Sequence, residues 1–288
     1  MNFLWRCLLF PLVIVFTSAS YAAETASPSC ADFVRLVPNL KLHQCTNAGL
    51  EDTQARSARK RVLWSKDWAE EDAKLRVIVV GGIHGDEMSS VSLVFHWMGL
   101  ARNSLADTPL PISWRFIPSL NPDGLLTRPA KRVNANGVDL NRNFPTPNWA
   151  RDARKYWETR TRKDPRRWPG SKPLSEPESQ FLFDQMNSFK PHLIVSVHAP
   201  YGVLDFDGPA VPPSRLGRLY LDQVGIFPGS LGNFGGVHKG VPVVTIELPS
   251  AVRTPTDAEM RQMWIDLLRW TTERLGPSMA SAAAELPK

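Results

Sequence analysis

The chain has 288 residues and a formal net charge of +6, with 43% hydrophobic and 22% charged residues. This length suits one large domain with a full core. Residues 151–167 hold eight basic and three acidic side chains, a net of +5, so nearly the whole charge excess lies in one stretch. The balanced remainder excludes a nucleic-acid-binding face with basic residues spread over it.

The first residues have the pattern of a secretory signal peptide. Arg6 precedes an apolar run at residues 7–16, and Ser20 and Ala22 have the small-x-small spacing of a cleavage site. We therefore predict that residues 1–22 are removed and that the protein is exported, to the periplasm or outside the cell. The apolar run is shorter than the roughly 20 residues of a membrane span. Because no later segment is long or apolar enough, no transmembrane segment is expected.

Residues 23–58 form a predicted N-terminal extension that contains two cysteines. Cys7 leaves with the signal peptide, so Cys30 and Cys45 remain as an even pair in an exported chain. A disulfide between them is the natural interpretation, and two buried free thiols are the alternative. Residues 59–276 are predicted to form the main domain, and residues 277–288 a flexible tail.

Short apolar runs alternate with helical patterns along the main domain. Near-continuous apolar runs are typical of strands that are buried on both faces, and they occur at residues 77–80, 114–118, 193–197 and 241–248. Helical patterns cover residues 89–105, 175–190 and 256–275. The last two begin with the spacing of a capping box, Ser175 with Glu178 and Thr256 with Glu259. The alternation predicts an α/β fold, a three-layer α/β/α sandwich with a mixed, mostly parallel central sheet.

The basic stretch at residues 151–167 lies between these patterns and allows two interpretations. Most such runs are solvated loops or helix faces. The sharper alternative is a docking surface for an anionic polymer of the cell envelope.

Polar side chains follow the predicted strands at the points where the strands end. The stretch "GGIHGDEMSS" places His84 and Glu87 after the first strand, and "NPDG" follows the second. His198 closes the third strand, and Glu247 lies near the end of the fourth. In open α/β sheets ligands bind at the carboxyl ends of strands. A surface turn that happens to contain a His and a Glu would explain the first pair but not all four positions.

His84, Glu87 and His198 form the ligand set of a catalytic zinc ion. Two histidines and one carboxylate leave a fourth position for water, and one zinc ion per chain is expected. The reaction also needs a group that takes a proton from water and passes it to the leaving amine. Glu247 is the candidate because it lies in an apolar run, where an unpaired carboxylate is costly. A satisfied structural glutamate is the alternative.

The motif "RVNANGVDLNRNFP" supplies long polar side chains for substrate binding. Arg132, Asn141 and Arg142 suit bidentate capture of a carboxylate and stabilisation of an oxyanion. Asp139 is expected to orient its neighbours rather than to react.

The motifs "HGDE", "NPDG", "NANGVDLNRNFP", "SVHAP" and "TIELP", in this order, resemble those of the zinc carboxypeptidase (M14) family of metallopeptidases. More narrowly, "HGDEMSS", "KPLSEPES" and "PGSLGNFG" resemble its murein peptide amidase A branch. The resemblance covers about residues 60–275, and it implies that residues 59–276 are a zinc peptidase domain.

The resemblance also implies a role for each matching residue. It makes His84, Glu87 and His198 the zinc ligands and Glu247 the general base and acid. It makes Arg132 the arginine that polarises the scissile carbonyl, with Arg128 as a weaker claimant. Asn141 and Arg142 then hold a terminal carboxylate.

One departure concerns the end group of the substrate. Many family members carry a tyrosine just before the catalytic glutamate, whereas this chain has "KGVPVVTIE" there. Tyr201 is an unsupported substitute. The departure argues against ordinary trimming of protein C-termini.

The leading functional hypothesis is therefore a periplasmic zinc amidase that cuts the γ-D-glutamyl–meso-diaminopimelate bond of peptidoglycan stem peptides or muropeptide fragments. The alternatives are a zinc carboxypeptidase of short peptides or of D-amino-acid stem ends, an aspartoacylase-like deacylase, and a non-catalytic wall-binding module. "NPDG" with "NANGVDLNRNF" favours peptide substrates over small acylated amino acids, and the retained ligands argue against a non-catalytic module.

Overall fold

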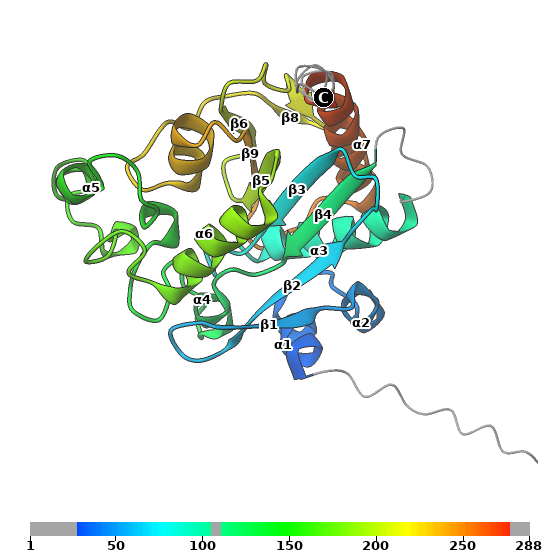
Figure 1. The fold of residues 1–288 in the computed structure, drawn as a ribbon. Coiled ribbons are helices and arrows are strands. Elements are labelled where there is room, and N and C mark those ends of the chain that lie inside the picture. Colours follow the sequence, from blue (N-terminus) through cyan, green and yellow to red (C-terminus); the bar gives the residue numbers. More distant parts are fainter. Residues whose placement is uncertain (1–27, 105–110, 277–288) are drawn as a thin grey trace, which may run out of the picture.

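The computed structural model describes residues 28–104 and 111–276. These residues fold around a central seven-stranded sheet (Figure 1). The predicted signal peptide at residues 1–22 and the predicted tail at residues 277–288 lie outside the described residues. In spatial order, the strands are β1 (Glu51–Arg56), β2 (Val62–Trp68), β4 (Ile112–Ile117), β3 (Leu75–Val80), β5 (Leu193–His198), β9 (Val243–Glu247) and β6 (Val203–Asp207).

The sheet is parallel at its centre and antiparallel at its edges. Strands β4, β3, β5 and β9 run parallel, whereas β2 pairs antiparallel with β1 and β4, and β6 pairs antiparallel with β9. Every residue of β5 and all but one of β3 are buried, which explains why their sequences are continuous apolar runs. The predicted mixed sheet is confirmed.

Helices cover both faces of the sheet. Helices α3 (Met88–Ser104) and α7 (Asp257–Arg274) pack on one face, and α6 (Pro177–Phe189) with the π-helix η3 (Gly232–His238) packs on the other. Successive side chains of a strand point to opposite faces. Accordingly, Val77 and Val79 belong to the core under α3 and α7, while Ile78 and Val80 belong to the core under α6. The predicted three-layer sandwich is confirmed.

The N-terminal extension is part of this domain. A disulfide joins Cys30 of α1 (Pro28–Leu36) to Cys45 of α2 (Leu42–Ala48). The Ser92 hydroxyl of α3 donates a hydrogen bond to the carbonyl of Pro38, at 2.9 Å. The predicted boundary between residues 58 and 59 falls between β1 and β2, two paired strands, so the extension supplies an edge of the sheet.

One of the two predicted capping boxes is confirmed and the other is wrong. Thr256 and Glu259 form the expected reciprocal hydrogen bonds at the start of α7. At the start of α6, however, Glu176 is the N-cap residue and its side chain makes no capping hydrogen bond. Glu178 instead accepts hydrogen bonds from the Ala58 backbone at 2.9 Å and from the Asn134 amide at 3.0 Å. This carboxylate therefore joins distant segments instead of capping its own helix.

The remaining described elements are short, apart from one helix. They are α4 (Pro122–Leu126), η1 (Leu140–Arg142), α5 (Trp149–Thr159), η2 (Pro165–Arg167), β7 (Arg215–Leu216) and β8 (Leu219–Tyr220). Within the described ranges, no helix has both the length and the apolar character that crossing a membrane requires.

Candidate active site

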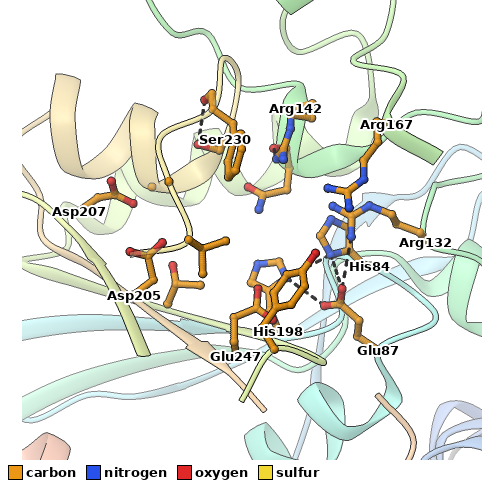
Figure 2. Close-up of a pocket in the computed structure, with 17 residues that line it drawn as sticks. His84, Glu87, Arg132, Arg142, Arg167, His198, Asp205, Asp207, Ser230 and Glu247 are labelled. Carbon is orange, nitrogen blue, oxygen red and sulfur yellow. Dashed lines mark hydrogen bonds and ion pairs between the residues drawn. The ribbon is translucent and has the colours of Figure 1, made fainter. Parts of the chain in front are cut away.

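The three predicted metal ligands lie together at the carboxyl ends of the central strands (Figure 2). His84 and Glu87 come from the loop after β3, and His198 is the last residue of β5. His84 Nδ1 lies 2.8 Å from Glu87 Oε1 and 3.1 Å from His198 Nδ1. All three side chains are buried, and their candidate ligand atoms lie within 4.8 Å of one another.

This donor set fits a zinc ion. Two imidazole nitrogens and one carboxylate are the protein ligands of many catalytic zinc sites, with one position left open. The second nitrogen of His84, Nε2, lies 3.0 Å from Asp139 Oδ1. An ionised carboxylate only accepts hydrogen bonds, so Nε2 carries a proton and Nδ1 is the nitrogen that would bind a metal ion. Such a partner is typical of a metal-binding histidine.

The loop that carries His84 and Glu87 is fixed by its neighbours. The Ser90 hydroxyl accepts a hydrogen bond from the Gly82 backbone at 3.0 Å and donates one to the Glu87 carbonyl at 2.6 Å. A side chain at Gly85 would collide with the backbone of Gly124 in α4. The glycine therefore lets the loop pack directly on α4.

Asp139 connects His84 of the metal cluster to Arg132. Its Oδ2 accepts a hydrogen bond from Arg132 Nε at 3.1 Å, while Oδ1 accepts from His84 and from the Asn141 backbone. Burial raises the pKa of Asp139, but the charge of Arg132 and the hydrogen bond from His84 oppose it, and the pKa lies well below its usual range. Asp139 is thus held as an anion that orients both neighbours.

Arg132 and Arg142 lie on the same side of the pocket in Figure 2. Arg132 Nη1 is 3.5 Å from Glu87 Oε1, so its guanidinium reaches the metal cluster. The Arg142 guanidinium lies 4.3 Å above the centre of the Phe227 ring. Burial lowers the pKa of Arg142 to about 10, which leaves it a cation at neutral pH.

Asn141 is oriented toward the same space. The Leu231 backbone N–H donates a hydrogen bond to Asn141 Oδ1 at 2.8 Å. The side-chain NH₂ of Asn141, which lines the pocket, is thereby left to donate to a ligand.

Glu247 is the last residue of β9 and lies in register with His198 on β5. It is 7% exposed, and its Oε2 has no hydrogen-bond partner among the described residues. Burial raises the pKa of Glu247, although His198 opposes the shift. A carboxylate beside the cluster, with a free oxygen and a raised pKa, is suited to proton transfer.

Sequence reasoning missed Asp205 and Asp207, which line the same pocket from β6. No Lys, Arg or His in the described part of the chain forms an ion pair with either carboxylate. Burial, together with the nearby Asp205 charge, raises the pKa of Asp207 to about 6. Gly232 of η3 leaves room for Asp207, since a Cβ there would collide with its carboxylate. The available signal was the sequence "VLDFD", in which acids alternate with apolar residues.

The pocket therefore has two walls of opposite charge. Figure 2 shows Arg132, Arg142 and Arg167 on one side and Asp205 and Asp207 on the other. Arg167 comes from the basic stretch and was also missed, because nothing distinguishes it from seven basic neighbours in the sequence.

Two further residues bear on the sequence predictions. Tyr201 lines the pocket and is 58% exposed, and its role as a cap over the substrate stays a prediction. Arg128 is exposed and does not line the pocket, which leaves Arg132 as the arginine beside the cluster.

Comparisons with known proteins agree with this geometry. The sequence pattern of the zinc carboxypeptidase family matches residues 52–205. The chain is 32% identical over 191 residues to the murein peptide amidase A of Vibrio campbellii. The alignment covers 63% of this chain and 72% of that protein.

Two solved structures share the fold. The murein-tripeptide amidase of Escherichia coli O157 has a TM-score of 0.53 at 24% identity, with 77% of this chain and 92% of that chain covered. Carboxypeptidase A of Helicoverpa armigera has a TM-score of 0.61 at 16% identity, with 82% and 69% covered.

Proposed function

Because this chain belongs to the zinc carboxypeptidase family and is a zinc metallopeptidase, we propose that it hydrolyses the γ-D-glutamyl–meso-diaminopimelate bond of peptidoglycan stem peptides. The observation that supports this proposal is that one wall of the pocket carries arginines and the opposite wall carries aspartates. Diaminopimelate has a carboxylate beside the scissile amide and, at its far end, an ammonium and a second carboxylate. Its two ends suit the arginine wall and the aspartate wall. The named activity of the Vibrio campbellii relative supports the same substrate class.

We assign one zinc ion per chain to His84, Glu87 and His198. When bound, the ion would supply a Lewis acid beside the scissile carbonyl. The convergence of three buried ligand groups, with His84 oriented by Asp139, supports the assignment.

The side chains around the cluster would polarise the carbonyl, bind the substrate and transfer the proton. Arg132 donates N–H groups to the carbonyl oxygen as negative charge develops there. Asn141 and Arg142 bind the carboxylate next to the scissile amide. Glu247 accepts a proton from the attacking water and returns it to the leaving amine nitrogen. The far ammonium group of the substrate then lies near Asp207.

The test is product identification by mass spectrometry. Wild-type protein incubated with L-Ala-γ-D-Glu-meso-diaminopimelate is expected to release free diaminopimelate and the dipeptide L-Ala-γ-D-Glu. A matched peptide with norleucine in place of diaminopimelate lacks the far ammonium group that the aspartate wall would bind, and is expected to be cut more slowly. An intact tripeptide, alongside ordinary L-peptides that lose C-terminal residues, would overturn the proposal.

A second function is favoured by one observation, the pair of unneutralised carboxylates on β6. A zinc carboxypeptidase that removes C-terminal lysine or arginine would use the same pair to bind the cationic side chain. The two functions differ on the acyl side of the cut bond. A carboxypeptidase of this kind would cut α-linked L-Ala-L-Lys faster than the γ-linked tripeptide.

We also propose that the protein is exported to the periplasm, on the basis of the pattern at residues 1–22. Cell fractionation followed by intact-mass measurement tests this. Periplasmic protein that lacks residues 1–22 is the expected result, and full-length protein confined to the cytoplasm would contradict it.

A further inference from the structure

The basic stretch at residues 151–167 reaches the active site through a single side chain. Among its eight basic residues, Arg167 alone lines the pocket that contains the metal cluster. Arg167 also lines an adjoining depression, together with Arg160 and Tyr156 of the same stretch. The two hollows share Arg167, so it stands where the metal pocket opens into the wider depression.

The segment that carries Arg167 is fixed to the active site from two directions. The neighbouring Arg166 forms an ion pair with Asp86, which directly precedes Glu87 of the metal cluster, at 2.7 Å. On the other side, the Asp139 backbone N–H donates a hydrogen bond to the Trp168 carbonyl at 2.8 Å. The position of Arg167 is therefore tied to both the metal loop and the residue that orients His84.

Aromatic packing holds the same segment against α5. The Trp157 and Trp168 rings meet edge to face, with centroids 4.5 Å apart. The Trp157 indole also donates a hydrogen bond to the Asp164 carbonyl at 2.7 Å. This turn is thus more closely packed than a solvated basic loop would be.

Arg167 differs from the adjacent Arg166 in having no counter-ion. Arg151, Arg154 and Arg166 each pair with a carboxylate. No Asp or Glu among residues 28–104 and 111–276 pairs with the Arg167 guanidinium. It lies near another cation instead, since its charge contributes, after burial, to the lowered pKa of Arg142. Like charges that are held together by a fixed backbone favour an anionic ligand between them.

We propose that Arg167 binds a second carboxylate of the substrate, on the acyl side of the scissile amide. This inference rests on the proposed function. In Figure 2, Arg167 lies on the side of Arg142 away from Asp205 and Asp207. The aspartates receive the leaving amino acid, so Arg167 faces the part of the substrate that keeps the scissile carbonyl.

The chemistry of a γ-linked glutamate matches this position. Its side-chain carboxyl forms the scissile amide, and its α-carboxylate stays free a few bonds away. An α-linked peptide offers a neutral amide group in the same region. Arg167 would therefore distinguish a γ-glutamyl bond from an ordinary peptide bond.

The experiment uses two tripeptides that differ in one group. One is L-Ala-γ-D-Glu-meso-diaminopimelate, and the other carries a carboxamide in place of the glutamate α-carboxylate. Wild-type protein is compared with Arg167→Gln and with Arg162→Gln, an exposed control on the same stretch that does not line the pocket. Because Arg167 would make a charge-assisted hydrogen bond to the α-carboxylate, amidation of that group is expected to lower wild-type kcat/KM about tenfold, mainly through KM.

Arg167→Gln is expected to lose this preference and to cut both peptides at similar rates, whereas Arg162→Gln keeps it. Arg167→Lys is expected to retain part of it, because lysine keeps the charge but not the planar fork. Wild-type protein that cuts both peptides equally would overturn the inference and leave the proposed function standing. An equal loss on both peptides in Arg167→Gln, with the preference intact, would reduce Arg167 to a structural role. Failure of wild type to cut either peptide would overturn the proposed function and this inference with it.

Discussion

His84, Glu87 and His198 lie at the carboxyl ends of two adjacent parallel strands, whereas three charged residues of the pocket walls, Asp205, Asp207 and Arg167, come from the periphery of the fold. Asp207 belongs to the antiparallel edge strand β6, and Arg167 to a short turn after α5. The ligand groups are joined by hydrogen bonds to one another and to Asp139. Arg167, Asp205 and Asp207, in contrast, form no ion pair with any described residue. We infer that the centre supplies chemistry common to all substrates and that the periphery selects among them.

This difference separates two kinds of substitution. A change at the centre is expected to reduce turnover of every substrate. A change at the periphery is expected to alter the ratio between substrates that differ in one charged group. The comparison fails if a wall substitution affects all peptides equally.

The largest effect is expected at Glu247. Glu247→Gln keeps the shape of the side chain and removes its proton acceptor, so turnover of every peptide should fall by about a hundredfold or more. Zinc content, measured by atomic emission, should stay near that of wild type. His198→Ala should instead lose the metal. Near-normal turnover in Glu247→Gln would show that another residue is the base.

The next effect concerns Asp139, which contacts the cluster only through His84 and Arg132. Asp139→Asn removes the negative charge that orients His84, and a partner of this kind contributes about 10- to 100-fold to metal affinity. Competition with a zinc chelator measures the change. Asp152→Asn is the matched control, because it breaks an exposed ion pair with Arg151. Equal zinc affinity in both variants would contradict the role given to Asp139.

The sequence predicted the centre well because its residues are local motifs at the ends of buried strands. A continuous apolar run identifies a central parallel strand, and such strands end at one edge of the sheet. The ligands His84 and Glu87 are separated by one turn of chain, and His198 and Glu247 end two strands that pair in register. The fold class and the ligand grouping follow from these features.

Asp205, Asp207 and Arg167 were missed because their function depends on tertiary neighbours. Nothing in the sequence distinguishes Arg166 from Arg167. In the structure Arg166 forms an ion pair with Asp86, whereas Arg167 lines the pocket. The predicted capping box at Ser175 failed for a similar reason. Tertiary hydrogen bonds to Ala58 and Asn134 occupy Glu178, and local spacing carries no information about them.

A smaller effect is expected at Asp207. Wild-type protein should prefer a peptide with a side-chain ammonium at the leaving residue over a norleucine counterpart by about tenfold, the value of one charge-assisted hydrogen bond. Asp207→Asn should abolish this preference and leave the rate on the norleucine peptide unchanged. Asp184→Asn, at an exposed site on α6, is the control. A preserved preference in Asp207→Asn would remove the cation-binding role from this wall.

The smallest effect is a pH dependence of that preference. The pKa of Asp207 is raised to about 6 by burial and by the charge of Asp205. A cation binds the ionised form, so the preference should be full above pH 6 and should decline as the pH falls through that value. Half a unit below its pKa a carboxyl group is about one-quarter ionised, so the tenfold preference should fall to about threefold there.

Protonation of the metal ligands lowers the rates on both peptides equally, and the ratio of the ammonium peptide to the norleucine peptide cancels that contribution. A ratio that stays constant from pH 7 to pH 5 would mean that the ammonium group does not meet Asp207. In Asp207→Asn the ratio should stay near one over the same range, because the carboxylate that binds the ammonium group has been removed. A pH-dependent ratio in that variant would move the cation site to Asp205.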